Sequence, residues 1–264
     1  MKTTYRKSWL LLYNTMVKAF SFCLYNPPNP LYYTGLLENI ELIQKYFPEA
    51  YTFVYIGNDV PDEFVIELRV RKNVVLRFTK ETGPANMIHR FFAIDEPEVD
   101  VMFCRDADSR IHWKDRWAIK EFLNHPTAKF HSIRDNPEHA TAVMGGLWGM
   151  KKMDGIHIQS LYLEHKASDP KGHGMGLDQD FLIDCVYPRV TNVMLIHSSQ
   201  TWRFRPFEVL IAFPFTYTND IYCGRVENIV YSEPTAPPNA FQNSPKPTNI
   251  LTTLNRNGRL PKLY

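Results

Sequence analysis

The amino-acid sequence predicts a single α/β domain with a mostly parallel central sheet and helices on both faces. Short runs rich in β-forming residues alternate with segments whose apolar residues recur at helical spacing. One run, Val101 to Cys104, is apolar without interruption, as in a strand buried on both sides. A chain of 264 residues with 44% hydrophobic content is long enough for one sizeable core.

The individual elements follow from the same patterns. Alternating bulky residues predict a first strand at 19–25, which leads into the proline-rich loop 26–30. Apolar residues at helical spacing then predict a helix that ends near Tyr46, before Pro48. The later elements are predicted as strands at 51–56, 74–78, 101–104, 128–133, 142–150, 192–198 and 221–226, and helices at 86–94, 113–125 and from 177 to about 186.

Three segments are expected along the chain. Residues 1–17 form an N-terminal extension, 18–232 the domain, and 233–264 an irregular tail rich in proline. The extension places basic residues before a short apolar run, but Asn14 and Lys18 interrupt it and no small-residue cleavage site follows. We therefore expect neither a signal peptide nor a transmembrane segment.

Charge and cysteine content narrow the function classes. The 30 basic residues are scattered among 28 acidic ones, and a net charge of +2 gives no support for a nucleic-acid partner. The four cysteines lie far apart and in no spacing typical of metal ligands. We expect reduced thiols in a cytoplasmic protein, and a location at the membrane surface is left open.

The most informative feature is the acidic pair Asp106 and Asp108, which directly follows the buried run. In open α/β sheets, ligands bind outside the carboxyl ends of the strands, where this pair is predicted to lie. Residues two apart on an extended chain can project to the same side and share one divalent cation. A plain acidic loop after a strand is the alternative.

Two further blocks follow the pair in a recognisable order. The sequence around the pair resembles the DxD signature of sugar-nucleotide glycosyltransferases with the GT-A (Rossmann-like) fold, of the kind found in bacterial surface-glycan clusters and large DNA viruses. The resemblance runs from about residue 32 to residue 226. Its motifs are RDADSR at 105–110, HSIRDNPEH at 131–139 and GGLWG at 145–149.

The resemblance implies a set of donor-binding residues. Arg90 matches a position that meets the nucleotide, and a guanidinium can donate two parallel hydrogen bonds to a diphosphate; an ordinary surface ion pair is the alternative. Tyr25, Tyr32 or Tyr33 would stack on the base, and aromatic core residues beside a strand are the alternative. Asp106 would lie beside the donor. Gly145, Gly146 and Trp148 would form a sugar-facing platform, and a glycine bulge beside a core tryptophan is the alternative.

The resemblance also implies the reacting groups. Asp178 corresponds to a position near the transferred sugar and the acceptor, as a general base if the anomeric centre is inverted and as an orienting group if it is retained. A simple helix cap is the alternative. His197, after a late strand, is expected to join Asp106 and Asp108 as a metal ligand. A mixed carboxylate and imidazole set suits Mn²⁺ better than Mg²⁺.

The predicted function is transfer of a sugar from a nucleoside-diphosphate sugar, with a UDP-sugar as the expected donor, to a hydroxyl of a glycan or glycoprotein acceptor. Two other classes stay open. A phosphohydrolase with an aspartyl nucleophile also places Asp-x-Asp after an apolar strand, but usually near the start of its domain. A non-catalytic glycan-binding module would not need Asp106, Asp108 and Asp178.

Overall fold

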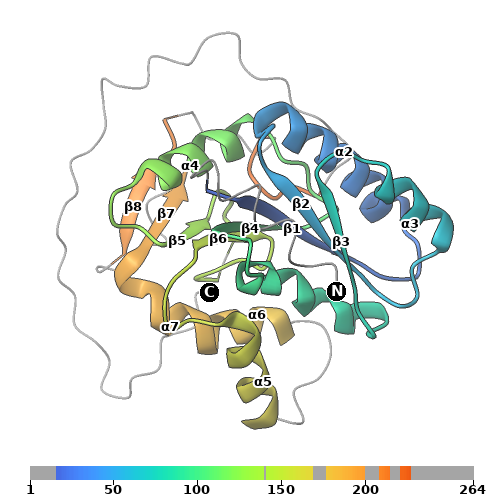
Figure 1. The fold of residues 1–264 in the computed structure, drawn as a ribbon. Coiled ribbons are helices and arrows are strands. Elements are labelled where there is room, and N and C mark those ends of the chain that lie inside the picture. Colours follow the sequence, from blue (N-terminus) through green and yellow to red (C-terminus); the bar gives the residue numbers. More distant parts are fainter. Residues whose placement is uncertain (1–15, 140, 169–176, 200–207, 215–220, 227–264) are drawn as a thin grey trace.

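The computed structural model describes residues 16–139, 141–168, 177–199, 208–214 and 221–226. These residues build one eight-stranded sheet in the order β3-β2-β1-β4-β6-β5-β7-β8 (Figure 1). Every neighbouring pair is parallel except the two that involve β6. The predicted fold class is therefore confirmed. The strands are β1 Lys18–Leu24, β2 Tyr51–Ile56, β3 Val74–Phe78, β4 Val101–Arg105, β5 Phe130–Ile133, β6 Leu147–Lys151, β7 Met194–Ser198 and β8 Val209–Ala212.

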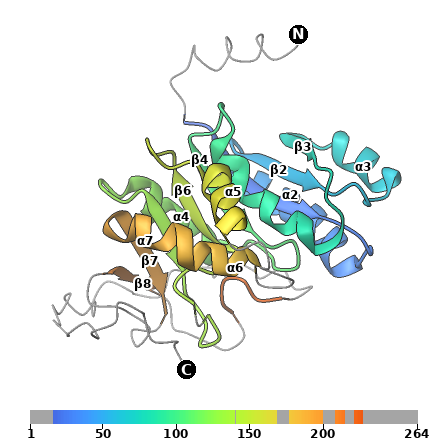
Figure 2. The ribbon, with the colours of Figure 1, turned by 90° about the horizontal axis from the view of Figure 1, so that it is seen from below.

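Helices cover both faces of the sheet, as the two views show (Figures 1 and 2). One layer contains α2 Pro30–Tyr46, α3 Asp62–Arg69 and α4 Trp113–Asn124. The opposite layer contains the 3-10 helix η1 Gly83–Asp95, α5 Ile158–Ser168, α6 Leu177–Phe181, the π-helix η2 Leu182–Val186 and α7 Tyr187–Val190, which is followed by the short 3-10 turn η3 Thr191–Val193. None of the helices in the described ranges is long and apolar enough to cross a membrane.

Alternation along the strands divides the core between the two layers. On β4, Val101 and Phe103 belong to the cluster under α2 and α4, whereas Met102 and Cys104 belong to the cluster under η1 and α6. Successive side chains of a strand point to opposite faces, so a strand covered on both sides must be apolar at every position. This explains the uninterrupted apolar run that precedes the acidic pair.

The direction of β6 determines what meets at the functional edge. Because β6 is antiparallel to β4 and β5, its first residue, Leu147, pairs with Arg105, the last residue of β4. The lead-in to β6, Gly145-Gly146, therefore lies at the edge where the parallel strands end. Segments separated by some 40 positions in the sequence thus share one end of the sheet.

Several elements differ from the expected ones. The predicted helix at 86–94 is a 3-10 helix, and α2 begins six residues before the first apolar residue of its pattern, at Pro30 with Asn29 as its N-cap. The sequence reasoning missed α3, α5 and β8, which are short or only weakly amphipathic. The expected strand at 221–226 is not one of the eight strands of the sheet; its last residue, Val226, forms an isolated bridge with Ser109. The tail, all but two residues of the expected extension, and residues 169–176 lie outside the described residues.

The cysteines behave as expected of reduced thiols. All four lie in the described ranges and none is in a disulfide. Cys23, Cys104 and Cys223 are buried, and burial is the first cause of the raised pKa of each of these thiols. A thiol that stays protonated behaves as a small apolar residue.

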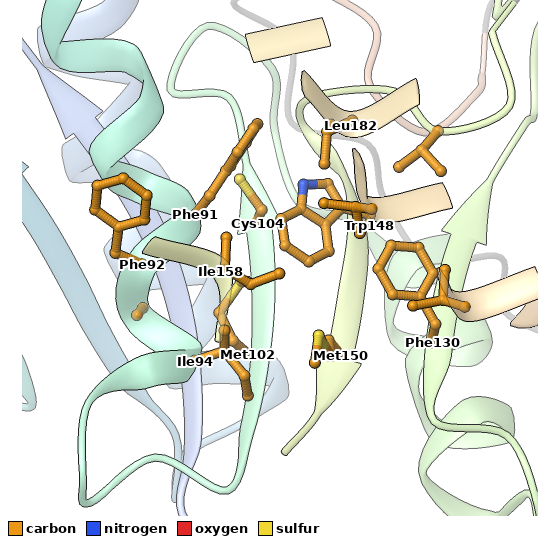
Figure 3. Packing of buried hydrophobic residues seen from close by; sticks show 14 of the residues in the cluster. Phe91, Phe92, Ile94, Met102, Cys104, Phe130, Trp148, Met150, Ile158 and Leu182 are labelled. Carbon is orange, nitrogen blue, oxygen red and sulfur yellow. The ribbon is translucent and has the colours of Figure 1, made fainter. Parts of the chain in front are cut away.

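Trp148 lies inside the core, not on a ligand-facing surface (Figure 3). Its ring is 0% exposed, stacked on Phe130 at 5.3 Å between ring centroids and edge-to-face with Phe91 at 5.2 Å. The expectation that Trp148 faces a sugar is not met here, because its place on β6 points the ring into the layer beneath η1 and η2. The alternative, a core tryptophan, describes the structure.

Replacing Trp148 with alanine is expected to lower the free energy of unfolding by about 3–5 kcal/mol, because a large buried ring leaves a cavity that the surroundings fill only in part. Urea unfolding of the purified protein measures this. Phe78, 60% exposed on the edge strand β3, provides the control, and Phe78→Ala is expected to cost less than about 1 kcal/mol. Wild-type stability in the Trp148 variant would contradict the core assignment.

Candidate active site

The acidic pair lies just beyond β4, as predicted. Asp106 follows the last strand residue directly and its side chain is 40% exposed, whereas Asp108 lies in the turn that follows. Burial and the negative charge of Asp106 raise the pKa of Asp108 to about 6. The hydroxyl of Tyr32, on α2, lies near the Asp108 carboxylate, and burial and this negative charge raise the pKa of Tyr32. Two like charges held this close favour a bound cation.

Arg90 joins the acidic pair to Asp178. Its Nη1 lies 2.9 Å from Oδ1 of Asp106, and its Nη2 lies 2.9 Å from Oδ2 of Asp178. Arg90 is only 7% exposed and is held from behind, since its carbonyl accepts a 2.6 Å hydrogen bond from Ser21 on β1. One guanidinium from η1 thus orders carboxylates from β4 and α6.

The glycine pair is required for this close packing. A Cβ on Gly146 would lie 2.0 Å from Oδ2 of Asp106, and a Cβ on Gly145 would lie 3.0 Å from Nη2 of Arg90 and 3.2 Å from Oδ2 of Asp178. Any side chain at Gly146 would therefore displace the Asp106 carboxylate. The two glycines lie beside the acidic pair. The groups that they approach are the charged side chains of Asp106, Arg90 and Asp178, whereas a sugar-facing platform was expected.

Gln179 fastens α6 to the lead-in of β6. Its Nε2 donates to the carbonyl of Val143, and its Oε1 accepts a 3.1 Å hydrogen bond from the N–H of Gly145. The adjacent carboxylate of Asp178 is held in turn, because its Oδ1 accepts the N–H of Gln179 at 2.9 Å. Gln179 was noted beside Asp178 in the sequence, but its clamping role appears only when the two segments meet.

The three predicted tyrosines are in different environments. Tyr25, directly after β1, is half-buried beside the charged groups; burial, then nearby Cys23 and Tyr32, raise its pKa to about 12. Tyr33 is 8% exposed, and its ring packs on Phe64 with centroids 4.5 Å apart. Tyr25 therefore keeps part of its side chain exposed beside the charged groups, whereas Tyr33 fills the space between α2 and α3. Tyr32, 38% exposed, is the neighbour that reaches Asp108.

The structure does not bring His197 to the acidic pair. His197 is 0% exposed within β7, and its Nδ1 lies 2.8 Å from Nε2 of His131. Strands β6 and β5 separate β7 from β4, so the two strand axes are about 14 Å apart at the usual spacing. Ligands of one cation lie within about 2.6 Å of it. The ring instead packs under α4 against Trp117, so the expected metal ligand is a core histidine here.

The second motif block, 131–139, forms a buried scaffold. Asp135, 0% exposed, accepts a 2.9 Å hydrogen bond from the N–H of Cys223 and lies 2.5 Å from Nζ of Lys114. Arg134 bonds the carbonyl of Ala142 and the carboxylate of Glu208. These contacts fasten late segments of the chain to the sheet. Because β5 runs in the same direction as β4, Arg134 and Asp135 lie at the same edge of the sheet as the acidic pair.

Beside this scaffold, His112, Asp115 and Cys223 present one potential metal-ligand atom each, all within 4.8 Å of one another. Their hydrogen bonds argue against a cation. The Nδ1 of His112 accepts the N–H of Lys114, and Asp115 pairs with Arg105 at 3.1 Å and accepts the N–H of His112. Nδ1 of His112 and both carboxylate oxygens of Asp115 are thus already bonded, next to the buried positive charges of Arg105 and Lys114.

No family model matches the chain, and neither does any curated protein. Solved structures of similar shape include a glycosyltransferase involved in glycosylation of the major capsid of PBCV-1, at 15% identity over 71% of this chain and 84% of that one, with a TM-score of 0.48. A mannosyltransferase from Pyrobaculum calidifontis, solved with GDP-Man and Mn²⁺, has 19% identity over 61% of this chain and 52% of that one, with a TM-score of 0.40.

A third is glucosyl-3-phosphoglycerate synthase from Mycobacterium tuberculosis, solved with Mn²⁺, UDP and glucosyl-3-phosphoglycerate, at 11% identity over 69% of this chain and 70% of that one, with a TM-score of 0.46. What each of these proteins binds is a property of that protein. At such identities, the reacting residues of this chain have to be found from its own geometry.

The burial of His197 predicts a dependence of stability on pH. Burial lowers the pKa of His197 to about 3, so the unfolded chain, with a histidine pKa of about 6.5, binds a proton that the folded protein excludes. As the pH is lowered from about 6.5 to about 3, the free energy of unfolding should therefore decrease, by about 1.4 kcal/mol per pH unit for this group. Urea unfolding at several pH values measures the slope.

In His197→Gln the slope is expected to decrease by about that amount, while Mn²⁺ affinity stays at the wild-type value. His157, whose side chain is 56% exposed, serves as the control, and His157→Gln should keep the wild-type slope. A large loss of Mn²⁺ affinity in the His197 variant would restore this residue as a ligand.

Proposed function

We propose that the protein is a metal-dependent glycosyltransferase, which moves a sugar from a nucleoside-diphosphate sugar to a hydroxyl of a glycan or glycoprotein acceptor. The observation that carries this proposal is the Arg90 bridge. It orders the first carboxylate of an Asp-x-Asp pair and a separate carboxylate, Asp178, at the carboxyl edge of one sheet. Sugar transfer needs a group beside the leaving diphosphate, which we assign to the Asp-x-Asp pair. It also needs a group beside the acceptor, which we assign to Asp178.

The acidic pair fits a divalent cation. Asp106 is partly exposed, and Asp108 has a pKa raised by burial and by the charge of Asp106, a cost that a cation would remove. When bound, the ion would neutralise the departing diphosphate as a Lewis acid. Without the His197 imidazole, the ligands on this edge are oxygens, which suit Mg²⁺ as well as Mn²⁺. We therefore assign Asp106 and Asp108 to the ion and leave out His197.

The remaining site residues take more specific roles. Arg90 orders Asp106 and Asp178, in place of the direct diphosphate contact that the resemblance implied. Tyr25 provides the aromatic surface for the base of the donor, for which we propose UDP. Gly145 and Gly146 have no side chain, so the carboxylates of Asp106 and Asp178 can approach the backbone here without a clash. Asp178, with Oδ2 on Arg90 and Oδ1 on the N–H of Gln179, is fixed to meet the acceptor.

Incubating the protein with a panel of nucleotide sugars and Mn²⁺, and following release of free nucleoside diphosphate, tests the proposal directly. Release from one donor, increased by an acceptor glycan, supports it. Liberation of inorganic phosphate from sugar phosphates without any nucleotide would support a phosphohydrolase instead. Sugar binding without turnover and unaffected by EDTA would indicate a binding module.

Asp108→Asn is expected to lower donor turnover at least 100-fold while the protein stays folded, because a turn residue outside the sheet contributes little to the core. Turnover of the wild type should likewise stop in excess EDTA. Asp154, exposed in a turn after β6, is the matched control, and Asp154→Asn should turn over normally. Wild-type activity in EDTA would contradict the metal site, and an unfolded Asp108 variant would indicate a structural role.

Asp178→Asn retains the size of the side chain but removes its basicity. Transfer is expected to fall about 100-fold or more, the usual effect of losing a general base, with nearly unchanged affinity for the nucleoside diphosphate. Calorimetry measures the affinity, and acceptor assays measure the transfer. Asp180, exposed on the same helix, is the control, and Asp180→Asn should behave as wild type. Loss of nucleotide binding in the Asp178 variant would place this carboxylate on the donor side.

A further inference from the structure

The loop that carries the acidic pair is held by α2, which lies some 70 residues earlier in the sequence. Asn39, on α2, is 0% exposed, and both ends of its amide are used by this loop. Its Nδ2 donates to the carbonyl of Ser109 at 2.7 Å, and its Oδ1 accepts the N–H of Ile111 at 2.9 Å. Both bonds end within three positions of Asp108.

A glycine lets the loop approach the helix. A Cβ on Gly35 would lie 2.1 Å from the carbonyl oxygen of Ala107 and 2.4 Å from Nη1 of Arg110. Glycine within a helix costs about 1 kcal/mol relative to alanine, so this position is unfavourable for the helix alone. The close contact with Ala107, which lies between the two aspartates, explains why this helix position is a glycine.

The same helix makes two more contacts with the loop. Glu38 pairs with Arg110, whose Nη1 donates to the carbonyl of Ala107 at 3.2 Å. The hydroxyl of Tyr32 lies near the Asp108 carboxylate itself. Residues 32, 35 and 39 are spaced three and four apart, which places them on one face of a helix.

We propose that Asn39 and Gly35 are positioning residues for the acidic pair: they fix the backbone between Asp106 and Ile111 so that both carboxylates face one cation. This inference rests on the proposed function, in which the pair holds the metal. Groups that orient metal ligands from behind typically contribute about 10–100-fold to metal affinity. The sequence motif ends at Arg110, and its geometry depends on a helix some 70 residues earlier.

The test compares three variants of the full chain with the wild type. Asn39→Ala leaves the loop groups of Ser109 and Ile111 without their buried partner. Gly35→Ala pushes the loop away by a different route, while favouring the helix. Asn86→Ala is the matched control: Asn86 is also 0% exposed, and its Nδ2 donates to two backbone carbonyls, those of Leu24 and Tyr55, which lie on β1 and β2.

Thermal melts first establish that each variant is folded. Mn²⁺ affinity is then measured by calorimetry without donor, and hydrogen exchange is followed in peptides that cover residues 106–111. Asn39→Ala and Gly35→Ala are each expected to weaken Mn²⁺ binding about 10–100-fold and to speed exchange in this loop. Asn86→Ala should lose stability but keep wild-type Mn²⁺ affinity and loop exchange.

Two results would overturn the inference, and they differ from a failure of the proposed function. Folded Asn39 and Gly35 variants with wild-type affinity and wild-type loop exchange would show that α2 does not position the pair. An equal loss of affinity in Asn86→Ala would show a general effect of destabilisation. If the wild type binds no Mn²⁺, or Asp108→Asn binds as tightly, the metal site itself is wrong. If Asn39→Ala does not fold, Gly35→Ala alone decides.

Discussion

The site depends on one buried guanidinium. Arg90 lies beside two carboxylates, those of Asp106 and Asp178, and two thiols at the end of the sheet, and its ion pairs connect the loop after β4 to α6. Removing one member of a buried ion pair leaves the other without compensation, which is strongly unfavourable. The surrounding backbone is correspondingly constrained. Ser21 holds the Arg90 carbonyl, and the two glycines before β6 approach the charged groups more closely than any other residue could.

Topology explains how such distant segments meet. With β6 antiparallel inside an otherwise parallel sheet, the start of one strand joins the ends of its neighbours. The glycine pair, the acidic pair and the end of β1 then share one edge. At the same edge, Asp135 and Arg134, which directly follow β5, use buried charges to fasten late segments, including Cys223 and Glu208. The acidic pair is thus partly exposed, and the charged groups beside it, Asp135 and Arg134, are buried and paired.

Rigid support on two sides gives the acidic loop a defined shape. From α2, Asn39 and Gly35 meet its backbone, and from η1, Arg90 meets its first carboxylate. A flexible acidic loop would have to be ordered each time that an ion or a charged donor binds. Loop residues held by elements that are themselves packed on the sheet have already lost that freedom during folding. The arrangement suits chemistry that requires two carboxylates at fixed positions.

The sequence by itself determined the fold class, most strand positions and the acidic pair, because these features depend on local alternation of apolar residues and on abrupt changes to charged ones. It also singled out Asp178, Arg90 and the glycines, which the structure brings together at one edge of the sheet. Only the tertiary structure decided that Trp148 and His197 are buried and that Tyr33 packs on Phe64. Both faces of every central strand are covered here, so a polar or aromatic residue at a strand position can belong to the core as readily as to a site. The side-chain partners of Arg90, Gln179 and Asn39 likewise lie 16 to 88 positions away (106 − 90 = 16 for Arg90 and Asp106). No local pattern encodes such contacts, since they arise only from strand order and helix packing.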